Sequence, residues 1–189
     1  MLFLCYSILK NLVKGKGIKM DRKNILLIGF MGTGKSTVSA KLKKMLDMKE
    51  VDTDALIVSR EGMSISDIFA TKGEEAFRNM ETALLGELKE EKNLIVSCGG
   101  GMALRDANAA IMKEAGTVVW LTAKPETILE RVKNDDSRPL LRGNKNVEFI
   151  ADLLNKRSPK YEAASDIAVA TDGRPVREIC EEIIEKLDK

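Results

Sequence analysis

Gly29-Phe30-Met31-Gly32-Thr33-Gly34-Lys35-Ser36-Thr37 directly follows the apolar run Ile25-Leu26-Leu27-Ile28. Its glycines, lysine and serine have the G-x-x-x-x-G-K-[ST] spacing of a phosphate-binding loop between a strand and a helix. In such a loop, backbone N–H groups and the positive end of the helix dipole surround a polyphosphate. The lysine bridges the β- and γ-phosphates, and the serine hydroxyl binds Mg²⁺. We therefore predict a nucleotide site made of Gly32, Thr33, Gly34, Lys35, Ser36 and Thr37.

The composition excludes several other classes of protein. A chain of 189 residues is the size of one domain, and its formal net charge of only +2 gives no one-signed field for nucleic acid or a membrane surface. The three cysteines have neither disulfide nor zinc spacing, which favours a reducing compartment. Because the chain has no histidine, carboxylates, lysines and arginines must carry any chemistry.

Residues 1–19 differ from the rest of the chain. They begin apolar and become basic, which is the reverse of a signal peptide, and the apolar part is too short to span a bilayer. The first predicted core strand starts a few residues after Met20. We expect residues 1–19 to be an extension outside the fold, and residues 20–189 to form a single cytoplasmic domain.

Beyond the loop, short apolar runs alternate with segments of helical periodicity. The expected strands are 25–28, 49–51, 93–97, 117–121 and 167–170, and the expected helices include 35–46, 106–114, 147–161 and 175–187. This alternation predicts an α/β fold, a three-layer α/β/α sandwich with a five-stranded parallel sheet. The polar, charged stretch 134–146 has the composition of a mobile surface segment, and we interpret it as a lid.

Two further groups of residues follow predicted strands. Asp52-Thr53-Asp54 ends the second strand and Gly99-Gly100-Gly101 ends the third. Open α/β sheets bind ligands at the carboxyl ends of their strands, and glycines let a backbone approach a ligand closely. The glycine run is equally typical of a simple strand-ending turn.

In this order the motifs resemble those of the shikimate kinases, in the nucleoside-monophosphate-kinase-like branch of the P-loop kinases. The resemblance covers about residues 24–175. It rests on the loop, the aspartate triplet, the glycine run and two further groups, which are Gly73-Glu74-Glu75-Ala76-Phe77-Arg78 with Glu81, and Arg138-Pro139-Leu140-Leu141 with Arg157 and Tyr161. The loop is shared by many families, but the ordered set is specific.

For the nucleotide, the resemblance implies that Arg131 stacks on adenine and that Arg174 borders the base. It also implies that Arg138 comes from the lid and, with Lys35, neutralises the moving phosphoryl group. Mg²⁺ would be held by Ser36 directly and by Asp52 through water. Lys35, Asp54 and Arg138 are the expected catalytic residues.

For the acceptor, the resemblance implies that Asp54 orients the attacking hydroxyl or accepts its proton, whereas an aspartate at this junction could instead cap a helix. Arg78 and Arg157 would clamp the substrate carboxylate, although charged residues on helices usually face solvent. Gly99, Gly100 and Gly101 would offer backbone N–H groups to the substrate ring. Cys98 has no histidine to activate it and is expected to be a small buried residue.

The resemblance implies a kinase that phosphorylates shikimate with ATP on the way to chorismate and the aromatic amino acids. We expect the protein to be a monomer. Gluconate kinases and nucleoside monophosphate kinases share the loop and the lid, but the aspartate triplet, Phe77-Arg78 and the glycine run argue against both classes. A nucleotide-dependent binding module without turnover is the third reading. It would be expected to lose Asp54, Arg78, Arg138 and Arg157, all of which are present.

Overall fold

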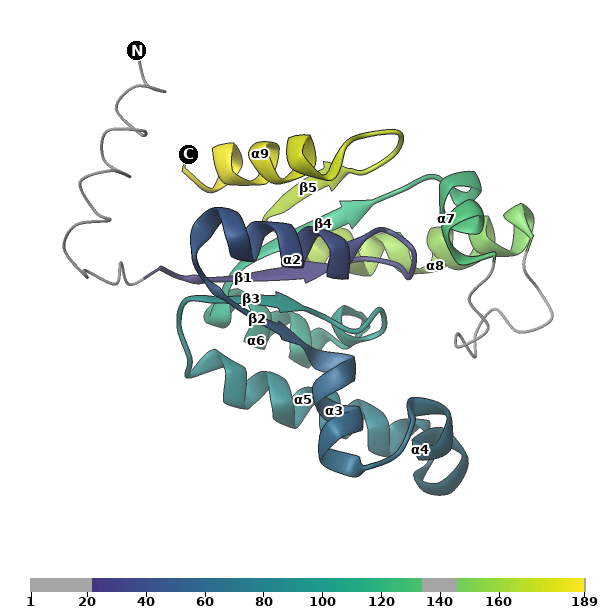
Figure 1. Ribbon diagram of the computed structural model, residues 1–189. Helices are drawn as coiled ribbons and strands as arrows, with labels where there is room; N and C mark the ends of the chain where they lie inside the picture. The colour runs from purple at the N-terminus through teal and green to yellow at the C-terminus, as the bar shows by residue number, and fades with distance from the viewer. Residues whose placement is uncertain (1–21, 134–145, 189) are drawn as a thin grey trace, which may run out of the picture.

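Five parallel strands form one sheet in the order β2-β3-β1-β4-β5 (Figure 1). The computed structural model describes residues 22–133 and 146–188, so the predicted extension, Arg138 and all of the predicted lid except Asn146 lie outside the described residues. The strands are β1 (Asn24–Ile28), β2 (Lys49–Asp52), β3 (Leu94–Ser97), β4 (Gly116–Thr122) and β5 (Ile167–Ala170). The predicted five-stranded parallel sheet is confirmed.

The central strand β1 is buried on both faces, as its uninterrupted apolar sequence predicts for a parallel sheet. Successive side chains point to opposite faces, so Leu26 and Ile28 enter one hydrophobic cluster while Ile25 and Leu27 enter another. β1 pairs with β3 on one side and β4 on the other. The loop that follows β1 therefore emerges at the middle of the sheet.

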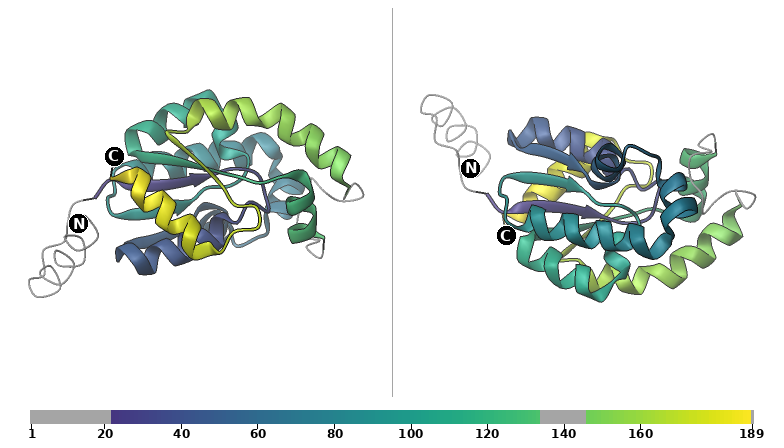
Figure 2. Two further views of the ribbon diagram at one scale, coloured as in Figure 1. Left: turned by 90° about the horizontal axis from the view of Figure 1, so that it is seen from above. Right: turned by 90° about the horizontal axis from the view of Figure 1, so that it is seen from below.

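Helices cover both faces of the sheet and complete the three layers (Figure 2). On one face lie α2 (Lys35–Leu46) and α9 (Val176–Leu187); on the other lie α5 (Glu74–Lys89), α6 (Asp106–Ala115) and α8 (Val147–Ala164). The shorter segments α3 (Thr53–Glu61), α4 (Ile65–Lys72), the 3-10 helix η1 (Met102–Leu104) and α7 (Pro125–Val132) border the end where β1 leads into its loop. No helix of the described part of the chain combines the length and hydropathy that crossing a bilayer requires.

The apolar stripes of the helices account for the packing. In α2, Val38 and Leu42 are buried against the sheet, as their spacing predicts. In α5, the buried stripe contains Phe77, Leu84, Leu85 and Leu88, but one of its positions is occupied by Glu81. A fully buried carboxylate in an apolar stripe is costly unless it is paired, so this exception marks a special environment.

Candidate active site

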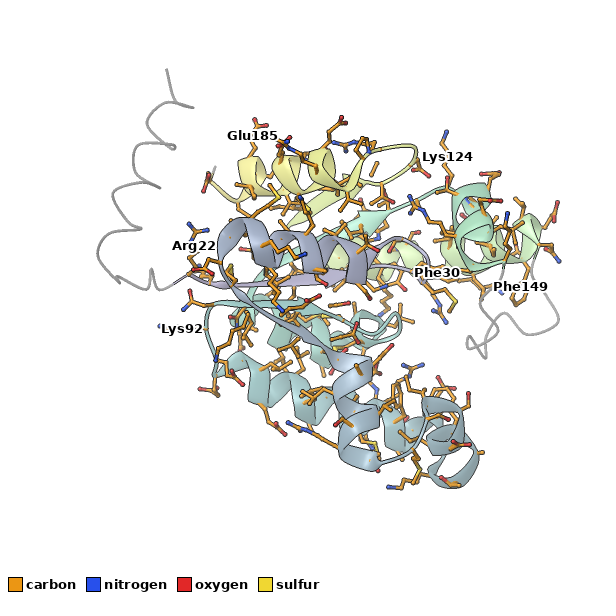
Figure 3. The ribbon with its side chains drawn as sticks, viewed as in Figure 1. Arg22, Phe30, Lys92, Lys124, Phe149 and Glu185 are labelled. Atoms are coloured by element: carbon orange, nitrogen blue, oxygen red, sulfur yellow. The ribbon has the colours of Figure 1, made fainter. Side chains whose placement is uncertain are left out.

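A cavity of about 640 Å³ opens at the carboxyl ends of the strands. Phe30, in the loop after β1, lies at this end, whereas Arg22 and Lys92 mark the opposite end of the sheet (Figure 3). The phosphate loop, α3, α5 and the glycine turn after β3 all contribute to the walls. Side chains from both the predicted nucleotide site and the predicted acceptor site therefore share one cavity.

The loop Gly29–Thr37 has the conformation that phosphate binding requires. Gly29, Gly32 and Gly34 all have positive φ angles, which turn the backbone around the site. Gly34 is the N-cap of α2 and supplies no side-chain hydrogen bond, so amides in the first turn of the helix remain available to an anion. Lys35 Nζ donates to the carbonyl oxygens of Gly29 and Phe30, at 2.9 and 3.0 Å, and is thus held over the loop.

The two residues predicted to hold Mg²⁺ lie side by side. Ser36 Oγ donates to Asp52 Oδ2 at 3.3 Å, which joins the start of α2 to the end of β2. Hard oxygen donors at the edge of a phosphate site suit Mg²⁺, which usually keeps several waters and takes few protein ligands. Asp52 Oδ1 also accepts from the backbone N–H of Ala55 at 3.1 Å. The helix N-cap that we weighed for Asp54 is therefore Asp52.

Asp54 lies in the first turn of α3 and lines the cavity. Its carboxylate packs directly on the glycine turn, because a Cβ on Gly99 would lie 2.4 Å from Asp54 Oδ1 and 2.8 Å from Glu81 Oε1. Two carboxylates from different helices thus converge on the space that the missing side chain leaves. Only glycine permits this approach.

Arg78 is held rigidly at the cavity wall. Its Nη1 donates to Glu81 Oε2 at 2.8 Å and its Nη2 to Glu74 Oε1 at 2.7 Å. The rings of Phe77 and Phe69 lie 5.5 and 5.9 Å from the guanidinium carbon, and only 16% of the side chain is exposed. Arg78 is therefore not a solvated charge on a helix face but a preoriented cation.

Glu81 was part of the family pattern, but the sequence assigned it no role. Its side chain is 1% exposed, and burial raises the pKa of its carboxyl group above the usual range although Arg78 opposes the shift. Oε1 has no hydrogen-bond partner among the described residues. The sequence did contain a signal for this role, because Glu81 occupies a position within the apolar stripe of α5.

The glycine turn connects the parts of the acceptor side. The Gly99 N–H donates to Thr53 Oγ1 at 2.9 Å, and the Gly100 carbonyl accepts from the Tyr161 hydroxyl at 2.5 Å. A Cβ on Gly101 would lie 2.3 Å from Arg78 Nη1, so the backbone here supports the guanidinium. Gly100 and Gly101 line the cavity, whereas the Gly99 amide is directed to Thr53.

Arg157 reaches the same cavity from α8. Its guanidinium carbon lies 5.5 Å from the centre of the Phe30 ring, a cation–π distance. Phe30 is a buried residue of the phosphate loop, so Arg157 contacts the loop directly. Arg78 and Arg157 thus line one cavity from two helices that are far apart in the sequence.

On the nucleotide side, two arginines rest on backbone carbonyl groups. Arg131 donates to the Gly32 oxygen at 3.0 Å and to both oxygens of Thr171, at 3.0 and 2.9 Å. Arg174 donates to the Ala170 oxygen at 3.0 Å and to Glu182 at 2.5 Å. Both arginines line the cavity, and the buried Thr171 that supports Arg131 was not identified from the sequence.

Cys98 is buried directly before the glycine turn, as predicted. Burial raises the pKa of its thiol far above the usual range, so the reactive thiolate is suppressed.

The parallel sheet, the glycine-rich loop after its central strand and the arginines around one cavity define a P-loop kinase. A family model described as shikimate kinase matches residues 31–188. The chain is 43% identical to a shikimate kinase of Dehalococcoides mccartyi, with 89% of this chain and 95% of the relative covered. It is 44% identical to one of Persephonella marina, with 87% and 99% covered. The chain belongs to the shikimate kinase family, as its motifs predict.

Solved structures agree with this assignment. Shikimate kinase from Acinetobacter baumannii in complex with shikimate has a TM-score of 0.83 and 34% identity, over 88% of this chain and 93% of that one. A gluconokinase from Sinorhizobium meliloti has a TM-score of 0.57 and 19% identity, over 90% of this chain and 94% of that one, which shows a shared fold alone. The comparison supports the acceptor class that the aspartate triplet and glycine run indicated.

Proposed function

We propose that the chain transfers the γ-phosphoryl group of ATP to the 3-hydroxyl of shikimate and releases ADP and shikimate 3-phosphate. The observation that carries this proposal is the acceptor wall of the cavity. Two arginines that suit a carboxylate and one aspartate that suits a hydroxyl line the space next to a phosphate loop. An acceptor with a carboxylate at one end and a hydroxyl at the other fits this arrangement.

The cations of the site have distinct roles in the proposal. Lys35 exchanges its carbonyl partners for the β- and γ-phosphates and stabilises the charge that spreads over the phosphoryl oxygens during transfer. Arg138 adds a second positive charge at the same atoms, a role that rests on the family resemblance because this residue lies outside the described part of the chain. Arg131 and Arg174 contact the base of ATP.

Asp54 accepts a hydrogen bond from the acceptor hydroxyl and orients it toward the γ-phosphorus. Arg78 and Arg157 hold the acceptor carboxylate, with Gly100 and Gly101 beside the ring. Ser36 would hold Mg²⁺ directly and Asp52 would hold it through water. When bound, this ion neutralises phosphate charge. We further propose that residues 20–189 act as a monomeric cytoplasmic domain, with residues 134–146 as its lid and residues 1–19 outside it.

A coupled ADP-release assay tests the proposal when shikimate, gluconate and nucleoside monophosphates are supplied in parallel. We expect turnover with shikimate to exceed that with the other acceptors by orders of magnitude. Phosphorus NMR of the product should show one new phosphate monoester on the shikimate ring. Preferential turnover of gluconate would establish the gluconate kinase alternative, and binding of ATP without transfer to any acceptor would establish the binding module.

A further inference from the structure

Thr53 lies between the two aspartates of the triplet, and its side chain is fully buried. The hydroxyl accepts from the Gly99 N–H at 2.9 Å and donates to the Ser97 carbonyl at 3.3 Å. Both of its partners belong to β3 or to the turn that follows it, whereas Thr53 begins α3. One hydroxyl therefore fastens the helix that carries Asp54 to the turn that faces the acceptor.

That turn carries the two ends of the acceptor site. At Gly99 it packs on the Asp54 carboxylate, and at Gly101 it packs on the Arg78 guanidinium. A further hydrogen bond, from the Met102 N–H to the Gly99 carbonyl at 3.0 Å, closes the turn on itself. The distance between the hydroxyl-binding end and the carboxylate-binding end therefore depends on how the turn is fixed to α3.

We infer that Thr53 is a positioning residue for the transfer reaction: its hydroxyl sets the spacing between Asp54 and Arg78, and so places the acceptor hydroxyl in line with the γ-phosphate. The inference rests on the proposed function. Thr53 does not touch the acceptor and acts through Asp54 and the glycine turn. Because a misplacement of about 1 Å can lower a transfer rate by about 100-fold, a buried bond of this kind can control turnover.

The first test replaces the hydroxyl with a methyl group of similar size. Thr53→Val should lower kcat for shikimate by about 10- to 100-fold, while KM for ATP changes less than about twofold because Lys35 and Arg131 keep their supports. Thr53→Ser keeps the hydroxyl and should retain kcat within about threefold. Equal loss in both variants, or kcat of Thr53→Val within about threefold of wild type, would overturn the inference.

A matched control separates positioning from stability. Asn24 is equally buried at the other end of the sheet, where its side chain bonds to the Leu88, Glu91 and Leu94 backbones. Asn24→Leu should therefore lower Tm as Thr53→Val does, through unpaired buried groups, but should leave kcat unchanged at temperatures where it is folded. If both variants lower kcat in proportion to their loss of Tm, Thr53 is merely structural.

The spacing itself is tested with shikimate amide, which carries no negative charge for Arg78 to hold. The Thr53→Val loss in kcat should be smaller with shikimate amide than with shikimate. An equal loss would show that Thr53 acts on Asp54 alone, contrary to the inference.

Hydrogen exchange of the Gly99 backbone N–H gives a readout independent of activity. It should be fast in Thr53→Val and slow in wild type and Thr53→Ser. If Thr53→Val does not fold, Thr53→Cys replaces it in each measurement. If the wild-type protein did not phosphorylate shikimate, the proposed function would be refuted. The hydrogen-exchange rate of the Gly99 N–H would still decide whether the Thr53 hydroxyl fixes the glycine turn.

Discussion

The two halves of the cavity hold their arginines and lysine in different ways. On the nucleotide side, Lys35 and Arg131 rest mainly on carbonyl oxygens of the loop and of Thr171. On the acceptor side, Arg78 bonds to the carboxylates of Glu74 and Glu81 and lies beside two aromatic rings that contact each other. Neutral carbonyl partners hold a cation weakly enough for phosphates to replace them, whereas charged partners in a buried site hold it in place. Apart from Arg174, which is paired with Glu182, the nucleotide half is thus placed to exchange partners, and Arg78 gives the acceptor half a fixed point.

The largest expected effect lies in the exchanging half. Lys35→Ala should lower kcat by about 100- to 1000-fold, because it removes a charge directed at the transition state. Tm should hardly change, since the bonds of Lys35 to the loop end on neutral carbonyl groups. Lys44→Ala, at an exposed position of the same helix, is the control and should behave as wild type. Kinetics and thermal unfolding of both variants check this, and near-normal turnover of Lys35→Ala would refute the nucleotide-site assignment.

The fixed half should lose affinity and stability together. Arg78→Ala should weaken shikimate binding by about 12- to 160-fold, the range for a hydrogen bond to a charged group. It should also lower Tm, because Glu81 would remain buried without its partner. Arg157→Ala should cost similar affinity with a smaller loss of Tm, and Lys at either position should rescue only in part. Titration calorimetry and thermal unfolding separate the two effects; equal Tm values for both alanine variants would contradict this difference between them.

A backbone substitution probes the same rigidity. Gly101→Ala places a Cβ against the Arg78 guanidinium and should raise KM for shikimate by about 5- to 30-fold, as overpacking of about 1–2 kcal/mol would. Gly86 is the matched control, because it lies on the same helix as Arg78, does not line the cavity, and a Cβ there would meet no atom within 4 Å. Steady-state kinetics of the two alanine variants give the comparison. Equal KM values would mean that Arg78 moves freely.

Arg131 should show a smaller effect confined to the nucleotide. Arg131→Ala should raise KM for ATP by about two- to fivefold, as loss of an exposed cation–π contact of about 0.5–1 kcal/mol would. KM for shikimate should stay unchanged because, in the described part of the chain, the hydrogen bonds of Arg131 go to Gly32 and Thr171 on the nucleotide side. A shift in both KM values would indicate that the two halves are not independent at this point.

The smallest effect concerns pH. Because the pKa of Glu81 is raised in the folded protein, folding takes up a proton above the ordinary value of 4.5, and this contribution to stability is lost as pH rises through the raised pKa. Glu81→Gln cannot titrate, so its unfolding free energy should fall less with pH in that window, by at most one proton in slope. Denaturant unfolding of both proteins at several pH values between 4 and 8 measures the difference. Parallel curves would show that the pKa of Glu81 is the same in the folded and the unfolded protein.

The nucleotide half and the acceptor half of the cavity differ in how well the sequence predicts them. The nucleotide loop is contained in nine consecutive residues, so its spacing alone fixed the geometry. The acceptor half is assembled from four segments distant in the sequence, which are α3, α5, the glycine turn after β3 and α8. It also depends on a strand register that pairs Asp52 with Ser97. No local pattern specifies that register. The bond from Thr53 to Gly99 could therefore be seen only in the fold, whereas Arg78 and Glu81, three residues apart on one helix, could have been paired from the sequence.

The contact between Arg157 and Phe30 has a thermodynamic consequence for the two substrates. The Phe30 carbonyl accepts from Lys35 and Thr33, while the ring of the same residue supports Arg157. When phosphates draw Lys35 away, the loop residue beneath Arg157 is relieved of one of its bonds. Any change in affinity for the acceptor that ATP produces through Phe30 must then appear equally in the affinity for ATP when the acceptor binds first. ATP and the acceptor can bind in either order, and the coupling free energy between them is the same for both orders.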